Sequence, residues 1–210
     1  MKIHSNPDAG ANKSKTLVVF AGPCLTGKTI LAKNVCNTLG IAVIDIDDVR
    51  AEICPREEVG VILPNEREGE VMLKCYKEMY RRAEIKLNKQ SAVAVVATHS
   101  KEEYHDMAST AAENASAKLM AVVPNLNLID DPASFLSDRL RLRNERRDSS
   151  SNVRGDDALS YALEVYGRYK EIGSKHASVI IKINPNYSIS ELEKHIVNEL
   201  SSQLALSLRR

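Results

Sequence analysis

Short apolar runs alternate with amphipathic segments along most of the chain. The apolar runs have the length of β-strands and show no polar alternation, which is typical of strands buried on both faces of a sheet. They lie at residues 16–21, 41–46, 92–98, 118–123 and 178–183. Apolar residues at helical spacing predict helices over residues 28–39, 47–53, 70–89, 135–147 and 157–172. Strands that alternate with helices indicate an α/β fold with about five mainly parallel strands and helices on both faces.

Local signals mark where further helices begin and where a loop interrupts the pattern. Ser100 with Glu103, and Ser188 with Glu191, match the capping-box pattern, so each pair predicts the start of another helix. Residues 54–69 contain two prolines and two glycines and are predicted to form a long loop. Loops of this length in a compact domain are usually functional or disordered, so this segment is a candidate for part of a site.

The composition is that of a globular protein with one domain. The chain has 210 residues, of which 43% are hydrophobic and 27% charged, and its formal net charge is +1. A dedicated nucleic-acid binder usually has a clearer basic excess, so we expect a small-molecule partner. Residues 1–15 are predicted to be a flexible tail before a single domain over residues 16–210, and no apolar run is long enough to cross a membrane. Four cysteines without metal-ligand spacing indicate free thiols and a cytoplasmic location.

A phosphate-binding loop joins the first predicted strand to the first predicted helix. The motif G-x-x-x-x-G-K-[ST] is matched in full by Gly22-Pro23-Cys24-Leu25-Thr26-Gly27-Lys28-Thr29. The two glycines let successive N–H groups point at phosphate oxygens, and the positive end of the helix faces the same anion. Lys28 is expected to reach the β- and γ-phosphates of ATP, and the Thr29 hydroxyl to bind Mg²⁺. A chance glycine-rich turn is the alternative, but the strand–loop–helix context is the one that the motif requires.

Acidic residues follow the second predicted strand. The chain reads Asp45-Ile46-Asp47-Asp48-Val49-Arg50 at this point, and the carboxyl ends of parallel strands face the ligand crevice. Asp47 is therefore a candidate base that accepts the proton of an acceptor hydroxyl, and Arg50 is a candidate for holding an anionic acceptor. The alternative is that Asp47 or Asp48 only caps the short helix, and one residue can do both. The predicted loop at residues 54–69 leaves this helix, so we expect it to face the acceptor.

The predicted helix at residues 135–147 is strongly basic. It contains one glutamate, Glu145, and five arginines, which are Arg139, Arg141, Arg143, Arg146 and Arg147. A kinase needs cations that meet the charge developing on the transferred phosphoryl group. The alternative is a solvated basic helix face, which is what most charge runs are. The guanine-reading N-K-x-D signature of small GTPases is missing from the sequence, which favours a kinase.

These motifs resemble those of the phage-type polynucleotide kinase domain and of the wider group of small P-loop kinases, which includes zeta-toxin-like kinases and antibiotic phosphotransferases. The sequence D-D-V-R at residues 47–50 resembles the D-D-x-R motif of that family. This resemblance implies that Asp47 is the general base and that Arg50 binds the acceptor. It also implies a fold of the nucleoside-monophosphate-kinase type.

Two further segments extend the resemblance. R-N-E-R-R at residues 143–147 resembles the lid segment of the family, which implies that Arg143 and Arg147 contact the ATP phosphates. We expect the lid to span residues 131–155 and to close over ATP, which excludes water. A-T-H-S at residues 97–100 is similar to the family's segment beside the acceptor, which implies that Thr98 contacts it.

The sequence departs from the family at two positions. Many relatives have an Asp near the end of the third strand, where this chain has Val96. If that Asp helps to hold Mg²⁺, another acid must substitute, and the candidates are Asp45 and Asp47. Leu25 replaces a small residue of the phosphate-binding loop, so the loop is expected to be tighter or tuned differently.

Three weaker candidates complete the predicted site. His99 either touches the acceptor or a phosphate, or is a structural histidine with satisfied hydrogen bonds, which is the favoured interpretation. Cys24 is either a redox-sensitive thiol activated by the helix N-terminus or, as we favour, a small packing residue. The turn at residues 184–186 follows the last predicted strand and resembles the one that borders adenine in related kinases.

The sequence thus predicts a P-loop kinase that transfers the γ-phosphate of ATP to a hydroxyl group of a small molecule, with Mg²⁺ as cofactor. One alternative is a polynucleotide 5′-hydroxyl kinase, which the near-neutral charge and the acids of residues 54–69 disfavour. The other is a nucleotide-binding regulator with little turnover, which the departure at Val96 leaves open. The sequence does not identify the acceptor or the oligomeric state.

Overall fold

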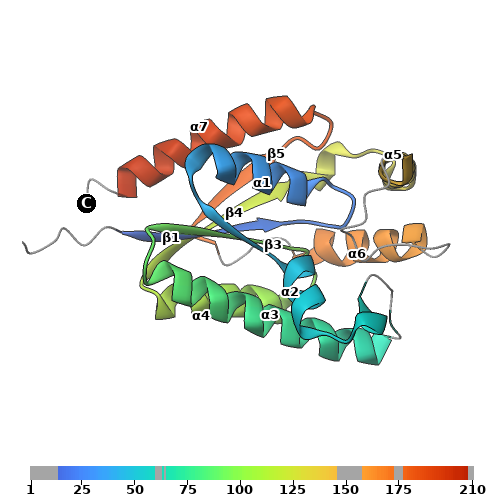
Figure 1. Ribbon diagram of the computed structural model, residues 1–210. Coiled ribbons are helices and arrows are strands. Elements are labelled where there is room, and N and C mark those ends of the chain that lie inside the picture. The colour runs from blue at the N-terminus through green and yellow to red at the C-terminus, as the bar shows by residue number, and fades with distance from the viewer. Residues whose placement is uncertain (1–13, 60–62, 64, 146–157, 173–176, 208–210) are drawn as a thin grey trace, which may run out of the picture.

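The computed structural model describes residues 14–59, 63, 65–145, 158–172 and 177–207. Within this part of the chain, five strands form one parallel sheet in the order β2-β3-β1-β4-β5 (Figure 1). The strands are β1 (Lys15–Ala21), β2 (Ala42–Asp45), β3 (Ala92–Ala97), β4 (Ala117–Pro124) and β5 (Val179–Ile183). The predicted sheet is therefore confirmed, and β1, which ends in the phosphate-binding loop, lies at its centre.

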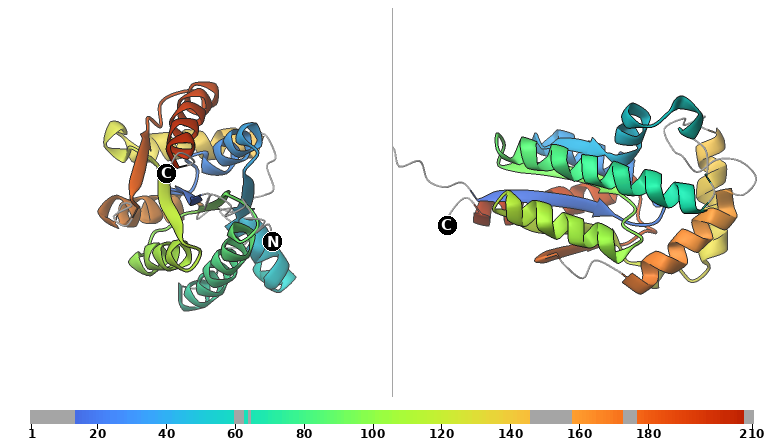
Figure 2. Two further views of the ribbon diagram at one scale, coloured as in Figure 1. Left: turned by 90° about the vertical axis from the view of Figure 1, so that its left-hand side faces the viewer. Right: turned by 90° about the horizontal axis from the view of Figure 1, so that it is seen from below.

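Helices cover both faces of the sheet and one of its ends. One face carries α1 (Lys28–Leu39) and α7 (Ile189–Ser207), and the other carries α3 (Asn65–Leu87) and α4 (Glu102–Asn114) (Figure 1). The end toward which β1 runs is surrounded by α2 (Ile46–Ile53), α5 (Pro132–Glu145) and α6 (Ala158–Ile172) (Figure 2). Two short 3₁₀ helices are η1 (Arg56–Glu58) and η2 (Leu126–Leu128). None of the helices in the described residues is long and apolar enough to span a membrane.

Burial on both faces explains why the three inner strands β3, β1 and β4 are rich in apolar residues. The prediction of burial on both faces is wrong for the edge strand β5, whose residues alternate between buried and exposed, with Ile180 42% exposed. All six residues of β3 are buried, because its side chains alternate between two hydrophobic cores. Val96 points into the core beneath α1 and α7, whereas Val95 and Ala97 point into the core beneath α3 and α4. Each fully buried valine contributes about 1.5–3 kcal/mol relative to an exposed one, so this central strand is a major source of stability.

The second strand and the third helix differ from the predicted bounds, most clearly at the end of β2 and at the start of α3. β2 stops at Asp45 rather than at residue 46, because the Asp45 carboxylate accepts a hydrogen bond from the Asp47 N–H at 3.1 Å and thereby starts α2. α3 begins at Asn65, five residues before the predicted start, so the predicted long loop at residues 54–69 is wrong in its second part. A glycine, Gly69, lies inside α3, and glycine in a helix costs only about 1 kcal/mol relative to alanine, which tertiary contacts offset.

One of the two predicted capping boxes is confirmed. The Ser188 N–H donates to a Glu191 carboxylate oxygen at 2.9 Å, and the Glu191 N–H donates to the Ser188 hydroxyl at 3.3 Å. The prediction at Ser100 is wrong. The N-cap residue of α4 is Lys101, the helix begins at Glu102, and no side chain in the described residues forms a capping hydrogen bond there. The chain turns earlier, at His99, which has a left-handed φ of 55°.

Candidate active site

The phosphate-binding loop occupies the turn between β1 and α1. Its backbone has positive φ angles at Gly22 (152°), Leu25 (66°) and Gly27 (79°). Gly22 is required on steric grounds as well, since a Cβ atom there would lie 2.8 Å from Cδ of Pro124. Leu25 accepts a left-handed conformation that leucine disfavours, and such local strain is typical of functional turns. The Gly22 N–H donates to the Thr98 carbonyl at 3.3 Å, which ties the loop to the end of β3.

The start of α1 has the properties of an anion site. Its N-cap is Gly27, no side chain in the described part of the chain caps it, and the first turn begins with Lys28 and Thr29 and contains no acid. Backbone N–H groups at such a helix start carry partial positive charge and suit phosphate oxygens. Lys28 Nζ donates to the Pro23 carbonyl at 3.3 Å, so its charge lies over the same loop. The predicted phosphate-binding residues therefore fit a nucleotide phosphate.

Asp45 lies at the end of β2, beside this loop. Its side chain is 4% exposed, and burial raises the pKa of its carboxyl, while the Asp47 N–H, Lys28 and Lys33 lower it. Lys33 Nζ lies 3.9 Å from the Asp45 carboxylate. Asp45 is the register partner of Val96, the position at which the resemblance predicts an acid. Carboxylate and hydroxyl oxygens are ligands that Mg²⁺ prefers, so the side chains of Asp45 and Thr29 have suitable chemistry for this ion, but the described residues contain no cluster of three or more acidic, histidine or cysteine side chains that could hold a metal.

Asp47 follows on the first turn of α2 and has the properties of a base. Burial raises the pKa of its carboxyl to about 6, with a further increase from Asp45, while Lys28 and Arg50 lower it. A carboxyl with this pKa is ionised at neutral pH and still binds a proton readily. The capping role that was the alternative for Asp47 or Asp48 belongs to Asp45, whose side chain accepts the N–H of Asp47.

Arg50 lies one turn further along α2 and is 1% exposed. Its guanidinium forms a bidentate ion pair with Glu68 of α3, with N···O distances of 2.7 and 3.1 Å. Its Nε and Nη2 also donate to the Glu58 carbonyl of η1 at 3.1 and 2.9 Å. The sequence analysis did not identify Glu68, because 18 residues separate it from Arg50 and no local pattern relates them. The predicted acceptor clamp is thus held by protein partners in this structure.

Thr98 and His99 form the turn after β3. Thr98 is half-buried, and its carbonyl accepts the Gly22 N–H. His99 is fully buried, its N–H donates to the Tyr76 hydroxyl at 2.7 Å, and its Nε2 hydrogen-bonds to the Tyr80 hydroxyl. Burial, and then His105, lowers the pKa of His99 to about 3, so the ring is neutral. These contacts favour a structural role for His99 in the turn that carries Thr98, although its hydrogen bonds are not all satisfied, because the buried Nδ1 has no hydrogen-bond partner among the described residues.

The arginines of α5 point in different directions. Arg141 is on the exposed side, with Glu145 at 2.9 Å and Asp138 at 3.7 Å. Arg143 is half-buried, and its charge is one of those that lower the pKa of Cys24 in the phosphate-binding loop. The structure therefore places Arg143 on the side of the predicted ATP phosphates. Arg147 and the part of the predicted lid from residue 146 to 155 lie outside the described residues.

Arg139 connects α5 to the turn after β5. Its guanidinium lies 5.2 Å from the Phe135 ring centre and donates to the Pro185 carbonyl at 3.2 Å. The same turn is braced by Asn186, whose side-chain amide donates to the Leu128 carbonyl at 2.9 Å. The predicted adenine-bordering turn at residues 184–186 is thus linked to the helix that begins the lid.

Cys24 is a packing residue. It is buried, and burial raises the pKa of its thiol despite the opposing charges of Lys28 and Arg143. A thiol in this state is a poor nucleophile, so the activating effect of the helix N-terminus does not prevail here.

Comparisons with known proteins agree with this geometry. A profile of the AAA domain family matches residues 17–163, which is 147 of the 210 residues. A sugar kinase from a Janibacter species has a TM-score of 0.61 at 14% identity, with 89% of this chain and 95% of that chain covered. A gluconokinase from Sinorhizobium meliloti 1021 has a TM-score of 0.56 at 16% identity, with 93% of this chain and 98% of that chain covered. The Mycobacterium tuberculosis APS kinase, solved with AMPPNP and APS, has a TM-score of 0.52 at 16% identity, with 90% of this chain and 98% of that chain covered.

These structural likenesses confirm the predicted α/β fold of the P-loop kinases. No curated protein shows significant sequence similarity to the chain. The finer resemblance to phage-type polynucleotide kinases and zeta-toxin-like kinases stays a prediction.

Proposed function

This chain belongs to the AAA domain family, and from the geometry of its site we propose that it is an ATP-dependent phosphotransferase that acts on a hydroxyl group of a small molecule. One observation carries the proposal. An uncapped helix start that suits phosphate and a carboxyl with a pKa of about 6 lie at the same end of the sheet, with Lys28 acting electrostatically on that carboxyl. The kinases among the structural neighbours, which act on gluconate and other small molecules, support the same reaction class.

On the donor side, the loop holds the triphosphate. The N–H groups of residues 24–29 and the Lys28 ammonium bind the β- and γ-phosphate oxygens of ATP and offset the charge that develops during transfer. Thr29 and Asp45 would hold Mg²⁺, which when bound neutralises phosphate charge. The lid arginines Arg143 and Arg147 complete the positive surroundings and exclude water when the lid closes.

On the acceptor side, Asp47 acts as the general base. Its carboxylate takes the proton of the acceptor hydroxyl while the hydroxyl oxygen forms a bond to the γ-phosphorus and the bond from that phosphorus to the β–γ bridging oxygen breaks. ADP leaves with the electron pair of the broken bond. Thr98, in the segment that resembles the family's acceptor-side segment, contacts the acceptor in this proposal.

The experiment compares Asp47→Asn with Asp48→Asn in an assay of ATP consumption across a panel of hydroxyl metabolites. Loss of a general base lowers kcat by about 10²–10⁴-fold, so Asp47→Asn should lose acceptor-dependent turnover and still bind ATP. Asp48 is exposed on the same helix, and its substitution should leave turnover unchanged. Normal turnover in Asp47→Asn contradicts the base assignment. Absence of Mg²⁺-dependent ATP binding, with no effect of Lys28→Ala, contradicts the proposed function itself.

A further inference from the structure

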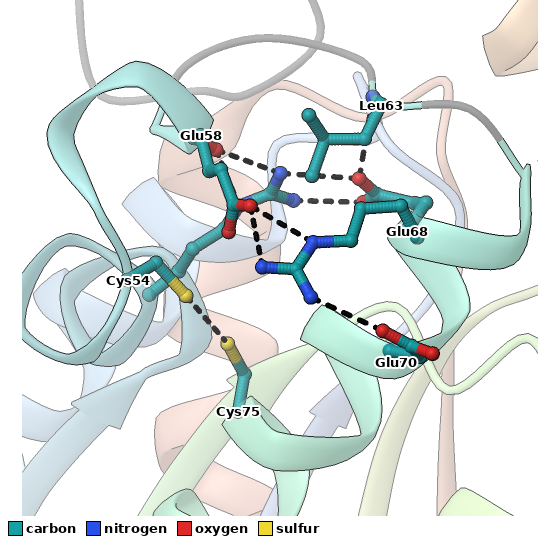
Figure 3. A network of polar contacts seen from close by, with 8 residues as sticks. Cys54, Glu58, Leu63, Glu68, Glu70 and Cys75 are labelled. Carbon is teal, nitrogen blue, oxygen red and sulfur yellow. Dashed lines mark hydrogen bonds and ion pairs between the residues drawn. The ribbon is translucent and has the colours of Figure 1, made fainter.

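The surroundings of Arg50 indicate which kind of acceptor the site takes. Figure 3 shows Glu58 of η1 and Glu68 and Glu70 of α3 as members of one network of polar contacts, and Glu58 and Glu68 both bond to Arg50. Glu68 contributes both carboxylate oxygens to Arg50 and also accepts the Leu63 N–H at 3.4 Å. The Glu58 carbonyl accepts two further hydrogen bonds from Arg50. Arg50 therefore holds η1 and the start of α3 together.

The Arg50–Glu68 pair is electrically neutral and hard to separate. Arg50 is 1% exposed and the Glu68 side chain is 15% exposed, so removing either partner leaves a charge with little access to water. An anionic group of an acceptor would have to displace both Glu68 oxygens from the guanidinium. An uncharged acceptor leaves the pair intact and does not meet this cost.

The rest of the acceptor side is also unfavourable to anions. Residues 45–70 carry nine acidic side chains and three arginines. Arg67, like Arg50, is paired with glutamates. Its guanidinium donates to Glu58 at 2.8 Å and to Glu70 at 3.1 Å. A surface with this balance repels an approaching anion and leaves neutral compounds unaffected.

We propose that the acceptor is an uncharged polyhydroxyl compound, such as a neutral sugar or nucleoside, and that Glu68 sets this specificity by neutralising Arg50. The inference rests on the proposed kinase function and names the class of its acceptor. It departs from the prediction that Arg50 holds an anionic acceptor, because Glu68 already neutralises Arg50 in this proposal. Glu68 is a specificity-determining residue that acts through Arg50.

The first experiment uses pairs of related acceptors in which one member is neutral and the other carries an anionic group. Glucose is compared with gluconate, and adenosine with adenosine 3′-phosphate, by the rate of ADP formation at fixed ATP–Mg²⁺. In whichever pair is phosphorylated, the neutral member should have a kcat/KM at least about tenfold higher than the anionic member. The reason is that binding of the anionic member breaks the charged hydrogen bonds between Glu68 and Arg50. An anionic member that is turned over as well as its neutral counterpart overturns the proposal.

Glu68→Gln tests the residue itself, with Glu70→Gln as the matched control from the same helix turn. The first substitution leaves the charge of Arg50 without its carboxylate and should narrow the preference for the neutral acceptor by about tenfold. Glu70 is exposed and pairs with Arg67, so its substitution removes one of the nine acids but leaves Arg50 paired, and it should change the preference much less than Glu68→Gln does. Equal effects of the two substitutions contradict a specific role for Glu68.

A binding measurement judges the inference without any turnover. The protein is saturated with AMPPNP–Mg²⁺, so that the phosphate-binding loop is filled, and then titrated with sulfate by calorimetry. Wild type should show no saturable sulfate binding, and Glu68→Gln should acquire it. Saturable binding to wild type overturns the proposal even if Glu68→Gln does not fold. Failure of every acceptor to be phosphorylated, by contrast, counts against the kinase function and leaves the result for Arg50 standing.

Discussion

Asp47→Asn should make the protein more stable at neutral pH while it removes the proposed base. The Asp47 carboxyl is partly buried beside Asp45, and its pKa is raised to about 6 from an ordinary value of 3.8. A raised pKa in the folded state means that ionisation of Asp47 opposes folding. The stability that the protonated form provides is fully present below pH 3.8 and is lost as the pH rises through 6. Asparagine has no charge to bury and does not incur this loss.

The size of the effect follows from the two pKa values. The difference is about 2 pH units, and each unit corresponds to about 1.4 kcal/mol, so the cost at pH 7 is about 3 kcal/mol. This is an upper value, because the Asp47 side chain keeps some contact with water. The free energy of unfolding of Asp47→Asn relative to wild type should therefore rise from near zero at pH 3.5 to about 2–3 kcal/mol at pH 7.

Urea unfolding followed by circular dichroism at several pH values between 3.5 and 7.5 measures this difference. Asp48→Asn is the control, because Asp48 is exposed on the same turn of α2 and its substitution should give a small difference that varies little with pH. A stability difference for Asp47→Asn that is the same at pH 4 and pH 7 would refute the reasoning. It would mean that the carboxyl is hydrated in the folded protein, and the argument for a tuned base at this position would fail with it.

Three further results are expected. The kcat of wild type should fall about tenfold for each pH unit below 6, because protonated Asp47 cannot accept the acceptor proton, and a flat profile between pH 5 and 7 would exclude it as the base. Gly22→Ala should lower the free energy of unfolding by about 2–4 kcal/mol, as the new Cβ meets the Pro124 ring in a strained backbone, and a thermal melt with unchanged midpoint would contradict the loop geometry. Cys54 should be the first thiol to react with a disulfide reagent under native conditions, because it is only partly buried whereas the other three cysteines are buried, and burial raises the pKa of Cys75 to about 12. Mass spectrometry of the labelled peptides measures the order of labelling, and faster labelling of Cys75 would contradict the prediction.

The fold could be predicted from the sequence because its signals are local. Each strand is mainly an apolar run with punctuation at its ends, and α1 begins at Lys28 and ends before Gly40, as its motif and its C-terminal glycine indicate. The phosphate-binding loop is equally local, since all of its residues lie between one strand and the next helix. Local reasoning failed at the start of α3, where contacts of Glu68 and Arg67 with α2 and η1 stabilise a helical turn that proline and glycine disfavour.

The partners of the site residues could not be predicted in the same way. Arg50 and Glu68 belong to different helices, and His99 meets Tyr76 and Tyr80 across 23 and 19 residues of sequence. Only the packing of α3 against α2 and β3 brings these groups together. The motif predicted Arg50 as a residue of the site, whereas the availability of its guanidinium for an anion depends on Glu68, which the motif does not include.

The departure at Val96 has a structural counterpart on the adjacent strand. In the parallel register of β2 and β3, Asp45 is paired with Val96, and paired residues of neighbouring strands point to the same face of the sheet. That face is the one covered by α1, which carries Lys28 and Thr29 at its start and Lys33 one turn later. An acid on β2 at this level thus reaches the same side of the phosphate-binding loop as an acid at position 96 would. Because Asp45 also raises the pKa of Asp47, moving the acid from the third strand to the second couples the proposed Mg²⁺ ligand to the proposed base.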